Sequence, residues 1–171
     1  MKSTGEVMGI SNSFGAAFAK AQLAASNGLP LEGTILVTVN DYDKPTVTPI
    51  ARRFHEMGFA LVATSGTAKY LRARGIPVNV VLKVHEGRPN CLDMILNGEV
   101  HMLVNTPLGK HAQWDDYTLR QAAIRNRVAY TTTLSAASAA SDAILSLRSR
   151  KPSVRSLQEW QQDILDAAAH T

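Results

Sequence analysis

Short apolar runs alternate with segments of helical spacing along most of the chain. Residues 34–39 form the first run, and after it the apolar side chains Val47, Ile50, Ala51 and Phe54 recur with helical spacing. The alternation continues with strand-like runs at 59–63, 79–82, 100–104 and 128–130 and with helix-like segments at 67–75, 91–96, 115–126 and up to 147. This order predicts a three-layer α/β fold, in which helices cover both faces of a five-stranded, mostly parallel sheet.

The N-terminal residues do not follow this alternation. Residues 13–26 predict a helix whose apolar face carries Phe14, Phe18, Ala21 and Ala25. We expect this helix to lie against the domain by its two phenylalanines or to pair with another copy of the chain. Residues 2–10 resemble a strand that has no partner nearby in the sequence, and an unpaired strand is an open edge.

The C-terminal residues form a further segment after a break at Pro152. Ser156 and Glu159 have the spacing of a capping box, which predicts a final amphipathic helix. A basic cluster precedes it and consists of Arg148, Arg150, Lys151 and Arg155. A solvated connector explains this cluster better than a nucleic-acid surface does, because no aromatic side chains are interleaved with the cations.

The composition is that of a single globular domain. The 171 residues suffice for one core, and 45% hydrophobic with 19% charged residues excludes a disordered chain. No apolar run approaches the roughly 20 residues of a membrane helix, and the single cysteine, Cys91, fits a reducing, cytoplasmic location. The net charge of +4 slightly favours anionic small molecules and does not indicate nucleic acid as a partner.

Hydroxyls, lysines and a glycine follow the ends of three predicted strands. Thr64, Gly66 and Thr67 lie where the second strand passes into a helix, and the unpaired N–H groups of a helix start favour an anion. Taken alone, Thr64 or Ser65 is better explained as a helix cap. Lys44 and Lys83 follow the first and third strands. Since the carboxyl ends of parallel strands share one edge, the joint placement predicts a phosphate pocket.

Other polar residues leave their roles open. Asn105 could contact a base or a sugar hydroxyl through its amide, or could bond its own turn before Pro107. Asp115 and Asp116 are interpreted as acids at a helix start, with a ribose contact from Asp115 as a weaker alternative. None of the five histidines has the spacing of a metal ligand, so no metal site is expected.

Several of these segments resemble the C-terminal part of carbamoyl-phosphate synthetase large subunits. The resemblance rests on KSTGEVMG at residues 2–9, SF at 13–14 and KAQL at 20–23, which are similar to the end of the carbamoyl-phosphate domain. It rests further on residues 33–39, ATSGTA at 63–68, KVHEGRP at 83–89, DMILNGE at 93–99, NTP at 105–107 and TTL at 132–134, which are similar to the allosteric domain. The resemblance therefore implies two parts: residues 1–30 as a remnant of the preceding ATP-grasp domain and residues 31–171 as a methylglyoxal-synthase-like regulatory domain.

The resemblance also implies a fold and a ligand. The fold is Rossmann-like, with strand order 3-2-1-4-5, and the ligand is a phosphorylated metabolite such as UMP or IMP. The family's phosphate and ribose contacts fall on Thr38, Lys44, Thr64, Thr67 and Lys83, and its base-side contacts fall near Val84 and Asn105. One contact usually made by a threonine falls on Pro107. A second effector site, for ornithine, would involve Tyr130 and Thr132, although Thr131 replaces the acid often found between them.

The resemblance further implies that this chain makes no carbamoyl phosphate by itself. The ATP-grasp halves and the glutaminase belong elsewhere, so no cofactor is expected here, and ATP with Mg or Mn belongs to the absent domains. The implied partners are the rest of the large subunit, the glutaminase small subunit, the nucleotide effector and, as an open option, further copies of the chain.

Two alternatives compete with an effector-binding domain. A methylglyoxal-synthase-like lyase acting on dihydroxyacetone phosphate would need a carboxylate base and a histidine, whereas Arg88 and Gln113 occupy those positions by approximate alignment, with Asp93 and His111 displaced. A structural docking module would make the lysines and threonines incidental.

Overall fold

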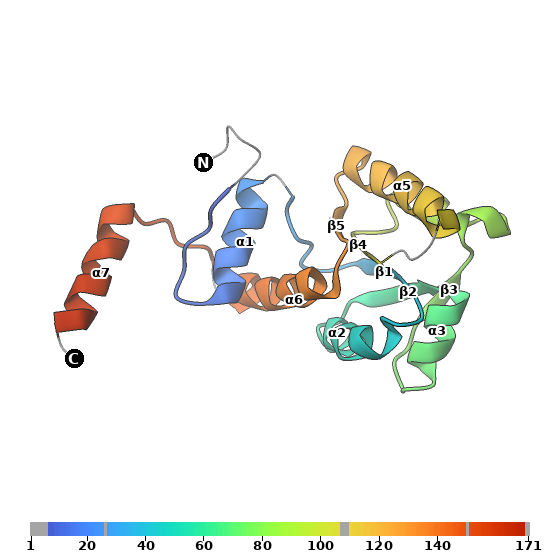
Figure 1. Cartoon of the computed structure of the whole chain (residues 1–171), viewed down its shortest axis with the longest axis horizontal. Coiled ribbons are helices and arrows are strands. Elements are labelled where there is room, and N and C mark those ends of the chain that lie inside the picture. Colours follow the sequence, from blue (N-terminus) through green and yellow to red (C-terminus); the bar gives the residue numbers. More distant parts are fainter. Residues whose placement is uncertain (1–6, 26, 107–109, 150, 170–171) are drawn as a thin grey trace.

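The computed structural model describes residues 7–25, 27–106, 110–149 and 151–169, and the side chains of 110–115 and 167–169 lie outside this description. A five-stranded parallel sheet forms its centre, with the order β3-β2-β1-β4-β5, and this confirms the predicted fold (Figure 1). The strands are β1 (Thr34–Val39), β2 (Ala60–Thr64), β3 (Asn79–Val81), β4 (Met102–Thr106) and β5 (Ala129–Thr131).

Helices cover both faces of the sheet, so the fold has three layers (Figure 1). One face packs against α2 (Lys44–Glu56), α3 (Ser65–Arg72) and α6 (Leu134–Ser149), and the other packs against α4 (Cys91–Leu96) and α5 (Lys110–Arg125). In β1, Ile35 and Val37 belong to the first core and Leu36 to the second, since successive strand side chains point to opposite faces. Burial on both faces explains why the strands read as continuous apolar runs.

Two element boundaries differ from the sequence prediction in ways that affect the pocket described below. The helix after β2 starts at Ser65 instead of near residue 67, which places Gly66 and Thr67 in its first turn. The helix after β4 starts at Lys110 instead of Asp115. The interpretation of Asp116 as a helix-start acid is therefore wrong, because it lies within the helix, where burial and its own bonding partners outweigh the preference of acids for the first turn.

The apolar face predicted for the N-terminal helix is confirmed only in part, since Phe18 packs partly buried against the first core. α1 (Phe14–Ala24) packs against α6 through Gly15 and Ala19, whereas Phe14 is 67% exposed. The two helices approach so closely that a Cβ on Gly15 would lie 2.7 Å from the Asp142 carbonyl oxygen. Small residues rather than phenylalanines make such an approach possible. Of the strand-like segment at 2–10, residues 7–10 form no strand, and residues 2–6 lie outside the described residues.

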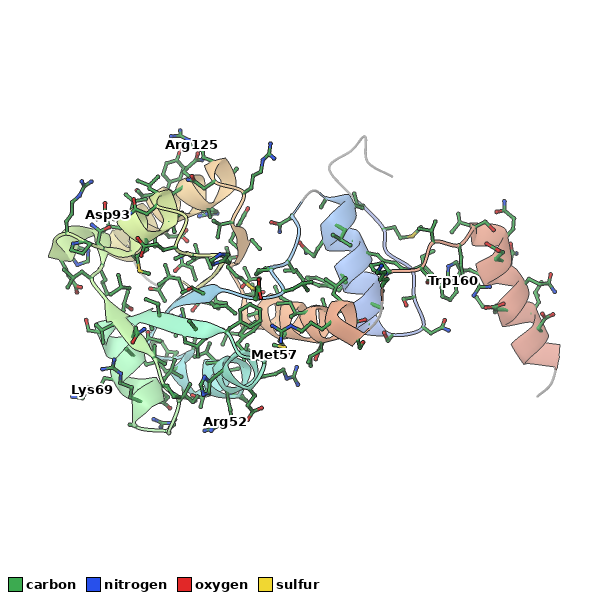
Figure 2. All side chains as sticks on the ribbon, turned by 180° about the vertical axis from the view of Figure 1, so that it is seen from behind. Arg52, Met57, Lys69, Asp93, Arg125 and Trp160 are labelled. Atoms are coloured by element: carbon green, nitrogen blue, oxygen red, sulfur yellow. The ribbon has the colours of Figure 1, made fainter. Side chains whose placement is uncertain are left out.

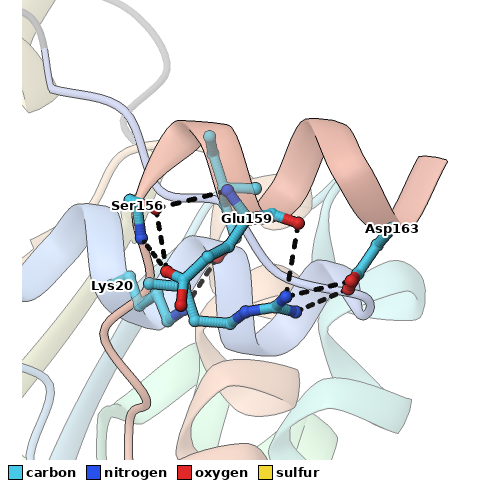
Figure 3. Close-up of polar contacts among 6 residues, drawn as sticks. Lys20, Ser156, Glu159 and Asp163 are labelled. Atoms are coloured by element: carbon cyan, nitrogen blue, oxygen red, sulfur yellow. Dashed lines mark hydrogen bonds and ion pairs between the residues drawn. The ribbon is translucent and has the colours of Figure 1, made fainter. Parts of the chain in front are cut away.

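The C-terminal helix α7 (Leu157–Ala169) extends away from the sheet (Figure 1). Its predicted capping box is confirmed: the Ser156 N–H donates to Glu159 Oε2 at 2.6 Å, and the Glu159 N–H donates to Ser156 Oγ at 3.2 Å (Figure 3). Trp160 points back toward α1, with Lys20 Nζ 5.7 Å from its ring centre (Figure 2). Among the described residues, no helix is long and apolar enough to cross a membrane.

Two cations of the predicted basic cluster are engaged within the fold. Arg148 Nε donates to the Leu31 carbonyl at 2.9 Å, and its guanidinium lies 5.1 Å from the centre of the Phe59 ring. Arg155 pairs with Asp163 at 2.6 Å, and this bond holds the pKa of the Asp163 carboxyl below its usual range (Figure 3). These contacts support the interpretation of the cluster as a connector.

Candidate functional site

The carboxyl ends of the strands open into a pocket of about 550 Å³, a size typical of small-molecule sites. Six of the residues predicted to contact a ligand line it, namely Thr38, Lys44, Thr64, Thr67, Lys83 and Asn105. They come from three strands and from the segments that follow β1, β2 and β3, as expected for the edge where parallel strands end. Other lining residues include Asn40, Asp41, Tyr42, Gly66, His85 and Asp116.

The junction between β2 and α3 supplies hydroxyls and helix-start N–H groups. Thr64 is only 4% exposed and adopts the extended conformation of a cap, but its side chain accepts no bond from the helix. Helix capping, the simpler explanation for Thr64, is therefore not what its hydroxyl does. Thr67 is 1% exposed, and its Oγ1 donates a long 3.4 Å bond to the Val39 carbonyl. A Cβ on Gly66 would lie 3.2 Å from Lys44 Nζ, so the glycine lets the ammonium approach the helix start.

Two ammonium groups enter the pocket from the segments that follow β1 and β3. The Lys44 side chain is 14% exposed, and its Nζ lies 2.5 Å from Oδ1 of Asp41, a residue that is itself 88% exposed. The Lys44 hydrogen bond holds the pKa of the Asp41 carboxyl below its usual range, and the charge of Lys83 lowers that pKa further. Both cations therefore stabilise the negative charge of the Asp41 carboxylate. The Asp41 carboxylate is exposed, and a phosphate would compete with it for Lys44.

The other side of the pocket comes from β4 and α5. Asn105 pairs in register with Thr38 of β1, and its amide Nδ2 donates to Asp116 Oδ1 at 2.5 Å. This bond gives the Asn105 amide a partner on α5; the alternative, a bond within its own turn, concerns residues 107–109, which lie outside the described residues. Asp116 is 5% exposed and also forms an ion pair with Arg120. Reasoning from sequence missed Asp116 as a pocket residue; the four-residue spacing of an acid and an arginine on one helix was the available signal.

Asn40 is a second pocket residue that the sequence analysis missed. Its Nδ2 donates to Asp43 Oδ2 at 2.6 Å and to the Thr106 carbonyl at 3.1 Å, while its Oδ1 accepts from the Tyr42 N–H at 2.9 Å. These bonds shape the turn after β1 and tie it to the end of β4. The signal in the sequence was an asparagine directly after a strand and before an aspartate-rich turn.

Three predicted contact residues lie outside this pocket. Val84 begins the short 3-10 helix η1 (Val84–Glu86) and packs half-buried against the second core, while the neighbouring His85 lines the pocket instead. Tyr130 and Thr132 lie at β5, the edge strand beyond β4, and line a different part of the surface. Between them, Thr131 Oγ1 is buried and has no hydrogen-bond partner among the described residues.

The carboxylate considered for lyase chemistry has a structural task. Asp93 Oδ2 accepts the Asn90 N–H at 3.0 Å and so closes the capping box of α4, and its other oxygen lies 3.6 Å from Arg88 Nε. Neither Asp93 nor Arg88 lines the pocket, and the Arg88 side chain is 78% exposed. The side chains of Gln113, His111 and Asp115, together with Pro107, lie outside the described part of the chain. Within that part, no three His, Cys, Asp or Glu side chains are grouped to hold a metal ion.

Comparison with known proteins agrees with the fold. The MGS-like domain model matches residues 46–132. A crystal structure of methylglyoxal synthase from Elizabethkingia anophelis superposes with a TM-score of 0.52 over 64% of this chain and 76% of that chain. Because the two sequences are only 19% identical, this likeness shows the fold alone.

Curated relatives are more similar in sequence. The carbamoyl phosphate synthase large chain of Gemmatimonas aurantiaca is 66% identical over 95% of this chain. The C-terminal section of the same kind of large chain from Methanopyrus kandleri is 51% identical over 93%. This chain spans only 15% of the first relative and 30% of the second. Together these matches confirm the resemblance found in the sequence: the chain belongs to the MGS-like domain family, in the form found at the C-terminal end of carbamoyl phosphate synthase large chains.

Proposed function

We propose that this chain is the effector-binding domain of a carbamoyl phosphate synthase, and that it binds a phosphorylated metabolite such as UMP or IMP. In this role it controls the synthesis of carbamoyl phosphate for the arginine and pyrimidine pathways. The observation that carries the proposal is that Lys44, Lys83, Thr64 and Thr67, from three consecutive strand-helix units, line one pocket.

The chemistry of these four residues suits a phosphate group. Hydrogen bonds from ammonium groups to phosphate oxygens contribute about 1.5–3 kcal/mol each, more than bonds between neutral groups. The start of α3 adds N–H groups whose capping oxygen is not supplied by Thr64. The exposed Asp41 at Lys44 already acts as an internal anion, which supports a site selective for negative charge.

The remaining expectations from the family extend this proposal. Residues 31–171 form the regulatory domain, and residues 1–30 belong to the end of the preceding domain. The rest of the large chain and the glutaminase small subunit are its partners in the cytoplasm, and they hold the ATP and metal sites. Tyr130 and Thr132 are candidates for a second effector site at the opposite edge of the sheet from β3.

A lyase is the less favoured function. Proton abstraction needs a carboxylate aimed at the bound substrate, and Asp93 is held instead at the start of α4 by Asn90 and Arg88. We expect purified protein to release no methylglyoxal from dihydroxyacetone phosphate above the uncatalysed rate. Turnover that disappears in Asp93→Asn would favour the lyase.

Ligand binding to the 171-residue chain tests the proposal directly. Thermal unfolding is measured with UMP, IMP, UTP, phosphoribosyl pyrophosphate, N-acetylglutamate and ornithine, followed by calorimetry on every compound that raises the melting temperature. A ligand at a hundred times its Kd stabilises the folded state by about 2.7 kcal/mol. Binding of a nucleotide monophosphate is the expected result. No stabilisation by any phosphorylated compound would contradict the proposal and favour a structural docking module.

A further inference from the structure

The pocket contains a hydrogen-bonded wall that the proposed phosphate site does not use. It consists of Asn105 on β4 and of Asp116 and Arg120 on α5. Asp116 and Asn105 are 5% and 6% exposed and line the pocket, whereas Arg120 lies behind them and does not line it. A carboxylate this deeply buried needs partners, and the amide and the guanidinium supply them.

These bonds determine which way the Asn105 amide faces. One N–H of its Nδ2 is donated to Asp116 Oδ1 at 2.5 Å, so the amide is turned with Nδ2 toward Asp116 and Oδ1 away from it, and Oδ1 has no partner among the described residues. Asp116 pairs with Arg120, and each carboxylate oxygen can accept more than one hydrogen bond. The wall therefore offers a ligand two neighbouring acceptors.

The acceptors lie on the opposite side of the pocket from the cations. β1 separates β4, which carries Asn105, from β2, which leads into Thr64 and Thr67. Two strand spacings amount to roughly 10 Å, the distance from a phosphate group to the far hydroxyls or the ring of a nucleotide. A ligand that fits both sides must be anionic at one end and carry hydrogen-bond donors at the other.

We propose that Asp116, held by Arg120, determines the specificity of this pocket by turning Asn105 into an acceptor. The ligand class is a phosphate monoester that presents donors, either sugar hydroxyls or a ring N–H, to the wall formed by Asn105 and Asp116. A second phosphate at that end is rejected, because it would face the Asp116 carboxylate. This inference rests on the proposed effector site and adds what the site discriminates.

The test compares ligands that differ by one donor. Dissociation constants are measured by calorimetry on the 171-residue chain for UMP, dUMP, N3-methyl-UMP and uridine 3′,5′-bisphosphate. Loss of a bond to a charged acceptor is expected to weaken binding about ten- to a hundredfold. Weaker binding of dUMP than of UMP identifies a sugar hydroxyl as the donor. Weaker binding of N3-methyl-UMP identifies the ring N–H as the donor. The bisphosphate is expected to bind at least tenfold more weakly than UMP, and the same series is repeated with IMP.

The Asp116→Asn variant then shows whether the wall is responsible. An amide at position 116 can donate as well as accept, which lets Asn105 turn, so the differences between these ligands are expected to shrink at least tenfold. Asp142→Asn is the matched control. Asp142 lies on α6 and pairs with Arg53 on α2, and neither residue lines the pocket. If Asp116→Asn does not fold, Asn105→Ala removes the same acceptor, and the same loss of discrimination is expected.

The outcomes separate the two proposals. If wild-type protein binds UMP or IMP and Asp116→Asn or Asn105→Ala discriminates among the ligands as wild type does, the inference is wrong and the effector site stands. Equal wild-type affinity for all four compounds would likewise overturn the inference alone. If wild-type protein binds no phosphorylated compound, the proposed function fails, and the inference fails with it.

Discussion

The two sides of the pocket carry opposite chemistry. The side at the ends of β1, β2 and β3 presents the ammonium groups of Lys44 and Lys83 and the hydroxyl of Thr64, a group that makes no bond to its own helix. On the side formed by β4 and α5, Asn105 and Asp116 are bonded to each other and to Arg120. On the first side, the ammonium and hydroxyl groups can therefore bond a ligand. On the second side, the carboxylate is already bonded by groups of the protein itself.

This difference separates affinity from discrimination. A cation paired with an exposed surface carboxylate can exchange that carboxylate for phosphate, and the gain contributes to binding. A buried carboxylate that already has two hydrogen-bonding partners adds little affinity when a ligand supplies one more donor. It weakens the binding of any ligand that places another acceptor beside it. Removing groups from the first side should change how tightly ligands bind, while removing groups engaged within the fold should change stability or selectivity.

The largest effect is expected from Lys83→Ala. Loss of a charge-assisted bond to phosphate should weaken UMP or IMP binding about ten- to a hundredfold, while the melting temperature of the unliganded protein hardly changes. Calorimetry measures the affinity. Lys69→Ala is the matched control, since Lys69 is an exposed lysine on α3 that does not line the pocket. Unaltered affinity in Lys83→Ala would remove this lysine from the site.

Thr64→Val tests whether the unused hydroxyl serves a ligand. The valine keeps the shape of the side chain, so nucleotide affinity should fall by up to about tenfold, the value of a bond between hydroxyl and ligand. Stability should change little because the hydroxyl does not cap α3. A clear loss of stability with unchanged affinity, measured by urea unfolding and calorimetry, would instead assign Thr64 a structural role.

Arg148→Ala provides the opposite case, a cation engaged within the fold. Arg148 bonds the Leu31 carbonyl and contacts the Phe59 ring, far along α6 from the pocket. Its removal takes away the same charge as Lys83→Ala, but it should lower the free energy of unfolding by about 1 kcal/mol and leave nucleotide affinity unchanged. If Arg148→Ala weakens binding as much as Lys83→Ala does, net charge rather than position governs affinity.

Asp41→Ala should have the smallest effect, and in the opposite direction. The carboxylate competes with phosphate for Lys44, so its removal should tighten binding about two- to fourfold. Because the pKa of Asp41 lies below its usual range, the competition persists at neutral pH and ends only when acid protonates this group. Affinity is compared at pH 7 and at two salt concentrations. Weaker binding in Asp41→Ala would mean that the carboxylate helps to position Lys44.

The first side of the pocket was predictable because strand ends can be located from apolar runs. Once β1, β2 and β3 are placed, parallel topology brings Lys44, Thr64 and Lys83 to one edge whatever the details of packing. The second side depended on where α5 begins. An error of five residues at that boundary turned Asp116 from a pocket residue into a helix-start acid. Val84 shows the same limit at smaller scale, since the 3-10 turn directs His85 and not Val84 toward the pocket.

The sequence by itself determined the alternation of strands and helices, the parallel sheet buried on both faces, and the collection of hydroxyls and lysines at one edge. These features follow from the local periodicity of apolar residues and from the alternation of strands and helices, both of which can be located along the sequence. Only the tertiary structure decided that Gly15 and Ala19, not Phe14, face α6, and that Asp116 closes the pocket with Asn105 and Arg120. Such contacts depend on the distance and rotation of helices over the sheet, and close packing, which local sequence does not encode, sets both.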